Sequence, residues 1–165
     1  MLTSNLPKVI MHVLIVCSAN MCRSPMAHAI LEEMCLRYEL PDLVVRSAGT
    51  IGYTGAPPVG NAREVCLEHD LSLDEFQSSA LSPELIRQAD CVLVMSDSHF
   101  RRVEALAKGQ PLSGKVHYIS EFHSDCQLPR EIPDPVGRGI EHFRVCFGVL
   151  QDCLEGFLES VVSSR

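Results

Sequence analysis

A cysteine and an arginine near the start of the chain are separated by five residues. Cys17 ends an apolar run, and Arg23 directly precedes Ser24-Pro25, a pair typical of a helix start. Unpaired backbone N–H groups at a helix N-terminus favour an anion, and a guanidinium binds two of its oxygens. The same positive surroundings favour the thiolate form of Cys17, which is the nucleophilic form. The segment therefore predicts one loop that binds an oxyanion and attacks it.

The spacing alone is a weak signal, because it also fits a buried structural cysteine beside a surface arginine. The position of the loop between a strand and a helix favours the chemical interpretation. Val9–Cys17 is rich in Val, Ile and Leu without polar alternation, which is typical of a strand buried on both faces. Ser24 is expected to cap the helix that follows, with Pro25 at its first position.

Strands and helices alternate along the rest of the chain. Further strands are expected at Leu43–Ser47, Cys91–Met95 and Val116–Ile119. Further helices are expected over Asn61–His69, after Ser82-Pro83, from a cap at Asp97 or Ser98 to about Lys108, and from Ile140 to Val161. This order predicts an α/β domain with a four-stranded parallel sheet and helices on both faces. In such folds ligands bind at the carboxyl ends of the strands, where Cys17 lies.

Composition limits the function classes. The 165-residue chain has a formal net charge of −7 and 46% hydrophobic residues. This acidic balance argues against binding of nucleic acid or an anionic membrane through a basic face. The apolar run Val9–Cys17 is far shorter than the roughly 20 residues that cross a bilayer. We expect one domain over residues 11–162, preceded by a flexible extension over residues 1–10.

The chain contains eight cysteines. A chain of this length with an ordinary core is not a disulfide scaffold, so reduced thiols and a cytoplasmic location are expected. Five cysteines on or beside apolar faces are expected to pack in the core: Cys35, Cys66, Cys91, Cys146 and Cys153. His117, His123 and Cys126 lack the spacing of metal ligands, so neither a metal nor another cofactor is expected.

The loop and several later segments resemble the low-molecular-weight protein tyrosine phosphatase family. The segments that carry the likeness are Val-Cys-Ser-Ala-Asn-Met-Cys-Arg-Ser-Pro-Met-Ala at 16–27, Ser47-Ala48-Gly49-Thr50, Ala89-Asp90, Met95 and Asp134-Pro135. The likeness covers roughly residues 11–157, nearly the whole chain. It implies the family's single three-layer domain and hydrolysis of phosphomonoesters, above all protein phosphotyrosine, through a phosphocysteine intermediate. The implied partner is a phosphorylated protein or peptide.

Carried over residue by residue, the resemblance makes Cys17 the nucleophile and Arg23 a phosphate ligand. Ser24 is implied to hydrogen-bond the sulfur, and Asn20 to fix the strained shape of the loop. The implied phosphate-binding residues beside Arg23 are Ser18, Ala19, Asn20, Met21, Cys22 and Ser24. Cys22 is also implied to close a reversible disulfide with Cys17 under oxidant.

Asp134 is implied to be the general acid for the leaving group and then the base for water. Pro133 and Pro135 bracket it and stiffen its backbone. Asp125 and Glu131 are the alternative candidates for the general acid, and neither lies directly between two prolines.

Several positions depart from the family pattern. Ala19 replaces a usual Gly and would cost about 1 kcal/mol if that position needs a positive φ. Val136 stands where many relatives have Tyr or Phe against an aryl substrate. Tyr53, in the loop from Gly52 to Gly60, lies where relatives often have an aromatic wall. A further departure is Glu75, near a position where many relatives have a His that supports the loop. Together, Met21, Tyr53 and Val136 are expected to line the substrate pocket.

Met21 bears on the choice of substrate. Tyrosine-directed relatives usually have Ile there and protein-arginine phosphatases have Thr, so the bulky apolar Met favours phosphotyrosine. Protein phosphoarginine is the alternative. A third candidate, arsenate reduction, needs resolving cysteines just after the third strand, and Met95–His99 contains none. No nucleic-acid or membrane partner is expected.

Overall fold

A parallel β-sheet forms the centre of the computed structural model, which describes residues 9–164. Within these residues the sheet has four strands in the order β2-β1-β3-β4. Their bounds are β1 Met11–Cys17, β2 Leu43–Gly49, β3 Cys91–Val94 and β4 Val116–Tyr118. Every neighbouring pair is parallel, and Cys17 at the end of β1 lies opposite Gly49 at the end of β2. The predicted fold class is confirmed.

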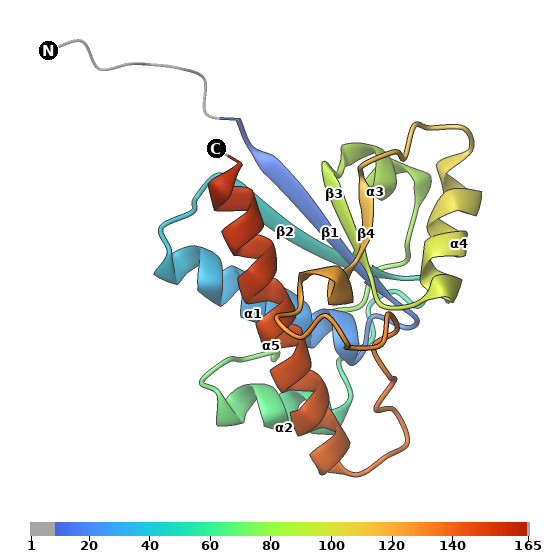
Figure 1. Cartoon of the computed structure of the whole chain (residues 1–165). Coiled ribbons are helices and arrows are strands. Elements are labelled where there is room, and N and C mark those ends of the chain that lie inside the picture. The colour runs from blue at the N-terminus through green and yellow to red at the C-terminus, as the bar shows by residue number, and fades with distance from the viewer. Residues whose placement is uncertain (1–8, 165) are drawn as a thin grey trace, which may run out of the picture.

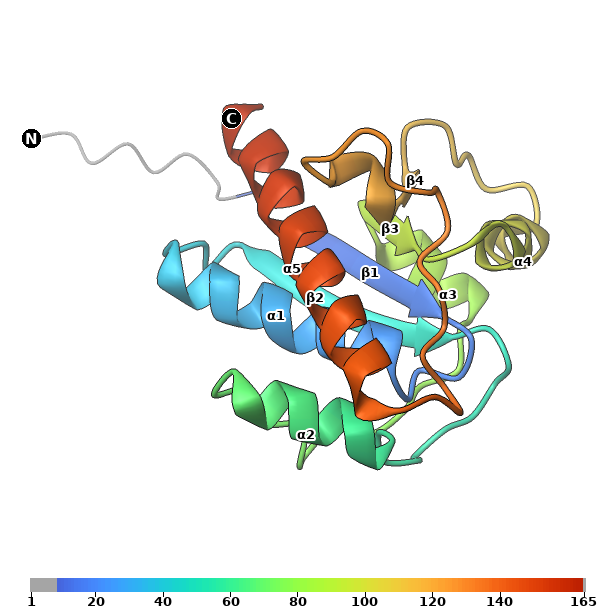
Figure 2. The same ribbon diagram turned by 60° about the horizontal axis from the view of Figure 1, so that its bottom comes forward.

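Helices cover both faces of the sheet (Figures 1 and 2). Their bounds are α1 Arg23–Arg37, α2 Gly60–Glu68, α3 Pro83–Gln88, α4 Asp97–Ala107, a short 3-10 helix η1 Ile119–Phe122, and α5 Ile140–Ser163. Helices α1, α2 and α5 lie on one face, and α3 and α4 on the other. The described chain thus forms three layers.

The central strand β1 explains why its sequence shows no polar alternation. Val13 and Ile15 pack into the core under α1, α2 and α5, whereas Leu14 and Val16 pack into the core under α3 and α4. All four side chains are at most 1% exposed. A strand buried on both faces must be apolar at every position.

Of the three predicted helix caps, two are wrong and one is confirmed. Ser24 does not cap α1, which begins at Arg23; the capping position is Cys22, without a side-chain cap. Helix α4 is capped by Ser96, whose side chain accepts the His99 N–H, and not by Asp97 or Ser98. Ser82 caps α3 as predicted and accepts from the Leu85 N–H. The error at Ser24 has a functional reason, because its hydroxyl contacts the Cys17 sulfur instead.

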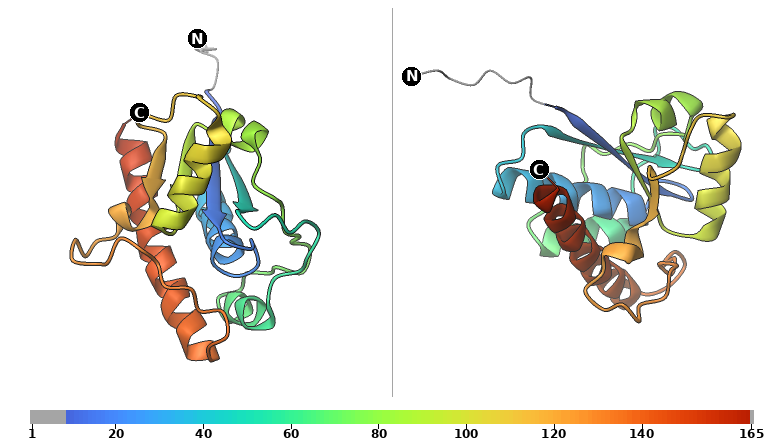
Figure 3. Two further views of the ribbon diagram at one scale, coloured as in Figure 1. Left: turned by 90° about the vertical axis from the view of Figure 1, so that its right-hand side faces the viewer. Right: turned by 45° about the horizontal axis from the view of Figure 1, so that its top comes forward.

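Helix α5 crosses the sheet face diagonally and ends near the start of β1, at the end of the sheet away from the loop after Cys17 (Figure 3). Its apolar side chains Phe143, Phe147, Leu150, Leu154 and Phe157 are buried against the core. The five predicted core cysteines are all buried, which confirms their packing role, and Cys126 is exposed.

Most of the predicted flexible extension, residues 1–8, lies outside the described residues. Strand β1 begins at Met11, two residues later than predicted. Within the described part of the chain, no helix combines the length and apolar character needed to cross a bilayer.

Candidate active site

The loop between β1 and α1 lies at the carboxyl ends of the strands, where the sequence places it. The end of β2 packs against the backbone of this loop. A Cβ on Gly49 would lie 2.7 Å from both the Ser18 carbonyl oxygen and the Ala19 carbonyl carbon. Just beyond Gly49, the N–H groups of Thr50 and Ile51 donate to the carbonyls of Cys17 and Ser18 at 3.0 and 2.9 Å. Gly49 therefore allows the loop backbone to rest directly on β2.

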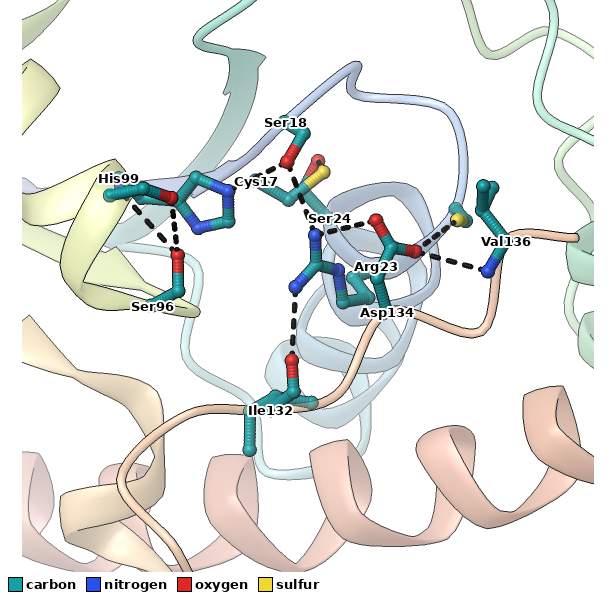
Figure 4. Close-up of polar contacts among 11 residues, drawn as sticks. Cys17, Ser18, Arg23, Ser24, Ser96, His99, Ile132, Asp134 and Val136 are labelled. Carbon is teal, nitrogen blue, oxygen red and sulfur yellow. Dashed lines mark hydrogen bonds and ion pairs between the residues drawn. The ribbon is translucent and has the colours of Figure 1, made fainter.

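Cys17 is 2% exposed, and its sulfur lies 2.9 Å from the Ser24 hydroxyl (Figure 4). Ser24 sits in the first turn of α1, so the helix start presents both its N-terminus and this hydroxyl to the sulfur. Both features stabilise negative charge on sulfur. The predicted contact between Ser24 and Cys17 is thus present.

Asn20 is fully buried and has a φ of +57°. Its Nδ2 donates to the hydroxyls of Ser24 at 2.7 Å and Ser47 at 3.1 Å, and its Oδ1 accepts from the Ser79 N–H at 2.8 Å. These bonds hold an uncommon backbone conformation in place. Ala19 has no positive φ, so the strain expected at that position falls on Asn20 instead.

The hydrogen-bonded network continues to the surface through residues that the sequence did not reveal. His28 Nδ1 lies 3.0 Å from the Ser47 hydroxyl, and its Nε2 lies 3.1 Å from the Glu32 carboxylate. The hydrogen bond between His28 and Glu32 holds the pKa of Glu32 below its usual value. Glu75, near the expected position of a supporting His, is exposed. The imidazole in this network is therefore that of His28 on α1. Glu32 can reach it because residues 28 and 32 lie on the same face of the helix.

Arg23 is 4% exposed and donates to three acceptors. Nη1 donates to the Ile132 carbonyl at 2.9 Å, and Nη2 donates to Asp134 at 2.9 Å and the Ser18 hydroxyl at 3.3 Å. Its Nε is buried and has no hydrogen-bond partner among the described residues. A buried cation with an unpaired N–H is suited to binding an anion.

Asp134 comes from a segment without regular structure between η1 and α5, more than a hundred residues from Arg23 in sequence. Its side chain is 40% exposed, and its other oxygen accepts from the Val136 N–H at 3.1 Å. The two competing carboxylates have other partners: Glu131 accepts from the Asp97 N–H and Asp125 from the Gln127 N–H. Of these three carboxylates, Asp134 is the one bonded to Arg23 (Figure 4).

Comparison with known proteins shows which family the chain belongs to. A model described as low molecular weight phosphotyrosine protein phosphatase matches residues 12–165. The chain belongs to this family. Like its other members, this low-molecular-weight phosphatase is a cysteine-dependent hydrolase.

The phosphatase is similar to two curated proteins of Escherichia coli K12. The low molecular weight protein-tyrosine-phosphatase Wzb is 34% identical over 140 residues, which cover 85% of this chain and 88% of Wzb. Etp, of the same description, is 32% identical over 139 residues, covering 84% and 86%. Among solved structures, the YwlE arginine phosphatase of Geobacillus stearothermophilus is 30% identical with a TM-score of 0.80, covering 93% of this chain and 94% of that one.

Cys22 lies beside the site with a strongly perturbed thiol. Burial, and then the charges of Asp134 and Cys17, raise its pKa to about 12. Its sulfur donates to Asp134 Oδ1 at 3.7 Å. The thiol form of Cys22 therefore predominates near neutral pH, and this form reacts poorly with sulfur electrophiles.

The predicted pocket residues lie in three different segments of the chain. Met21 is half-buried in the phosphatase loop, whereas Tyr53 and Val136 are each 53% exposed. The segment that carries Tyr53 is bonded to the loop on both sides, through the Ile51 N–H to Ser18 and the Val59 N–H to the Met21 carbonyl at 2.9 Å. Val136 follows Asp134, as Figure 4 shows. The role of these three residues in a substrate pocket stays a prediction.

Proposed function

We propose that this phosphatase hydrolyses protein phosphotyrosine with Cys17 as nucleophile, Arg23 as phosphate ligand and Asp134 as general acid and base. One observation carries the proposal: the Arg23 guanidinium joins the loop that begins at Cys17 to the carboxylate of Asp134 through hydrogen bonds of 3.3 and 2.9 Å. The groups proposed as nucleophile, oxyanion ligand and proton donor therefore come from two parts of the chain, the unit from Cys17 to Arg23 and the distant segment that carries Asp134.

The reaction proceeds in two displacements at phosphorus. The Cys17 thiolate attacks phosphorus, a P–S bond forms, and the P–O bond to the tyrosine breaks while protonated Asp134 transfers its proton to the leaving oxygen. Asp134, now a carboxylate, takes a proton from water as that water attacks phosphorus and breaks the P–S bond. Inorganic phosphate leaves, and Cys17 returns as thiolate. Arg23 and the loop N–H groups of Ser18, Ala19, Asn20, Met21 and Cys22 stabilise the phosphoryl oxygens throughout, and Ser24 stabilises the sulfur.

Two substitutions and matched controls test these roles. We expect Cys17→Ser to abolish hydrolysis of p-nitrophenyl phosphate, whereas Cys126→Ser, which changes an exposed thiol, leaves it unchanged. Asp134→Asn should lower kcat by about a hundredfold, and Asp125→Asn should not. Full activity in Cys17→Ser would refute the mechanism. A rapid acid quench should trap phosphate on Cys17, most clearly where the second step is slowed in Asp134→Asn.

The choice of phosphotyrosine over phosphoarginine depends on Met21. A bulky apolar side chain in the loop favours an aryl group next to the phosphate, and Tyr53 on the rim adds an aromatic surface. Phosphoarginine is the second candidate, because the YwlE arginine phosphatase is 30% identical. Turnover of matched phosphotyrosine and phosphoarginine peptides should favour the former, and Met21→Thr should reduce that preference. A higher kcat/KM for phosphoarginine would reverse the assignment, and an arm with arsenate and thioredoxin tests the third candidate.

We also propose that Cys22 protects Cys17 by forming a disulfide under mild peroxide, and that the protein works in a reducing compartment such as the cytoplasm. The proposed nucleophile is inactive whenever Cys17 is bonded to another sulfur. The raised pKa of Cys22 predicts slow disulfide closure at neutral pH. Asp134→Asn removes one of its causes and should accelerate closure. Peptide mass mapping that finds only sulfinic Cys17 after peroxide would contradict the proposal.

A further inference from the structure

Ser18 and His99 form a side-chain pair that the mechanism above does not use. The Ser18 hydroxyl and His99 Nε2 are 2.9 Å apart, although 81 residues separate them in sequence. Ser18 follows Cys17 directly, and Arg23 Nη2 donates to the same hydroxyl at 3.3 Å. Figure 4 shows the hydroxyl of Ser18 between the His99 ring and the Arg23 guanidinium.

His99 is placed to make this bond and is 1% exposed. It lies in the first turn of α4, where the Ser96 hydroxyl accepts its backbone N–H. Within residues 9–164, its Nδ1 has no hydrogen-bond partner. Burying an imidazole is unfavourable unless its polar atoms are bonded, so the bond to Ser18 offsets part of the cost of burial.

The neighbours of Ser18 limit how its hydroxyl can point. A hydroxyl has one O–H to donate and two lone pairs that accept, and Arg23 only donates. Burial, with the charge of Arg23, lowers the pKa of His99 to about 4, so the ring is neutral near pH 7 and carries one N–H. The ring therefore either donates from Nε2 to Ser18 or accepts the Ser18 O–H.

A bound phosphate selects the first arrangement. When Nε2–H donates, both lone pairs of Ser18 are occupied and its O–H is free for an oxygen held at Arg23. A hydrogen bond from the Ser18 O–H to an anionic oxygen is stronger than a hydrogen bond from it to a neutral ring. We propose that the Ser18 hydroxyl contacts the phosphoryl group directly and that His99 is the positioning residue that directs it. This inference rests on the proposed function, because the oxygen is the one that Arg23 binds.

Removal of the hydroxyl tests the contact itself. We expect Ser18→Ala to lower kcat/KM for p-nitrophenyl phosphate about tenfold and to raise the inhibition constant of inorganic phosphate by a similar factor, as for a hydrogen bond to a charged group. Ser98→Ala, an exposed serine in the same turn as His99, should change neither constant.

Two amide variants test the positioning role of His99. The side-chain N–H of His99→Gln reaches the place of Nε2, whereas that of His99→Asn reaches only the place of Nδ1. We expect Gln to retain kcat/KM within about threefold of wild type and Asn to fall to the level of Ser18→Ala. In the Ser18→Ala background the two variants should be equal, because the bond that distinguishes them is gone. A merely structural role would lower both variants alike in either background.

Calorimetry with inorganic phosphate separates this inference from the proposed function. If no phosphoryl substrate is turned over, the proposed function fails, but the affinities of wild type, Ser18→Ala and the two amide variants still report on the pair. Thermal unfolding shows which variants are folded, and Ser18→Ala carries the test if the buried His99 does not tolerate change. Equal phosphate affinity in wild type and Ser18→Ala would overturn the inference.

Discussion

The two sides of the site are held in different ways. On the nucleophile side, Cys17, Asn20 and Ser24 are at most 2% exposed and are connected by bonds of 2.7 and 2.9 Å. On the acid side, Asp134 is 40% exposed and lies in a segment without helix or strand. The side with Cys17 is therefore part of the core, whereas the side chain of Asp134 lies at the surface.

The difference agrees with the roles proposed for the two sides. A loop that stabilises charge on phosphate works best when its dipoles are already in place and do not move in the reaction. A proton donor must instead meet a leaving group and then water, so it has to be accessible. The segment that carries Asp134 is anchored just before it, where the Ile132 N–H donates to the Met95 carbonyl at 2.9 Å, whereas the Asp134 side chain itself stays exposed. The nucleophile side should therefore be more sensitive to substitution than the acid segment around Asp134.

Outside the reacting groups themselves, the largest effect is expected where the loop rests on β2. Gly49→Ala places a Cβ 2.7 Å from loop backbone atoms, which must then shift. A displacement of about 1 Å in a catalytic group lowers rates roughly a hundredfold, and overpacking costs about 1–3 kcal/mol of unfolding free energy. Steady-state kinetics and chemical denaturation measure the two effects.

The matched control is Gly148→Ala in α5, where a Cβ meets nothing within 4 Å. It should leave kinetics unchanged and raise stability by up to about 1 kcal/mol, because Ala favours a helix over Gly. If Gly49→Ala shows wild-type kinetics, the loop is not preorganised by β2.

Asn20 separates the hydrogen-bonded network from the backbone shape. Asn20→Ala loses the side-chain bonds and keeps a Cβ at a φ of +57°, a conformation that Ala tolerates less well than Asn, so we expect a loss of about 3 kcal/mol in unfolding free energy. Asn20→Gly loses the same bonds without the steric strain and should be about 1 kcal/mol more stable than Ala. Both should lower kcat/KM about tenfold. Equal stability of the two variants would mean that the φ of Asn20 carries no strain.

The nucleophile side was largely predictable from sequence because its parts are local. Cys17, Arg23 and Ser24 lie within one strand–loop–helix unit, so the alternation of elements places them together. The wrong cap at Ser24 is instructive: a serine before Pro25 usually caps a helix, but here the hydroxyl bonds to the Cys17 sulfur.

Contacts between distant segments could not be predicted in this way. His99 reaches Ser18 across 81 residues, and neither local pattern indicates the other. His28 was missed because a histidine on an amphipathic helix looks like an ordinary surface residue until Ser47 is placed beside it. For Asp134, the family resemblance indicated a role, and the structure supplied its bond to Arg23.

On the acid side, Glu131 should have a moderate effect. Its carboxylate accepts the Asp97 N–H at 2.9 Å and so ties the segment to the start of α4, where negative charge is favoured. Glu131→Ala frees this tether, and we expect kcat to fall about threefold while the inhibition constant of inorganic phosphate is unchanged, since only the acid is displaced. Asp125→Ala, which removes a turn contact in the same segment, should change neither. Weaker phosphate inhibition in Glu131→Ala would show that both sides move together.

The smallest effect is expected where the buried network reaches the surface. The hydrogen bond from His28 lowers the pKa of Glu32, so this carboxylate stabilises the folded state above its unfolded pKa, and the contribution is lost as pH falls through the lower folded pKa. Because the Glu32 side chain is 60% exposed, Glu32→Gln should cost no more than about 0.5 kcal/mol at pH 7. The gap to wild type should close as pH falls through the lowered folded pKa of Glu32, whereas Glu64→Gln, an exposed carboxylate on α2, serves as the control and should show no such gap. Chemical denaturation at several pH values measures this difference in unfolding free energy. A loss in kcat/KM above about twofold in Glu32→Gln would mean that the preorganised network around Cys17 extends to the surface.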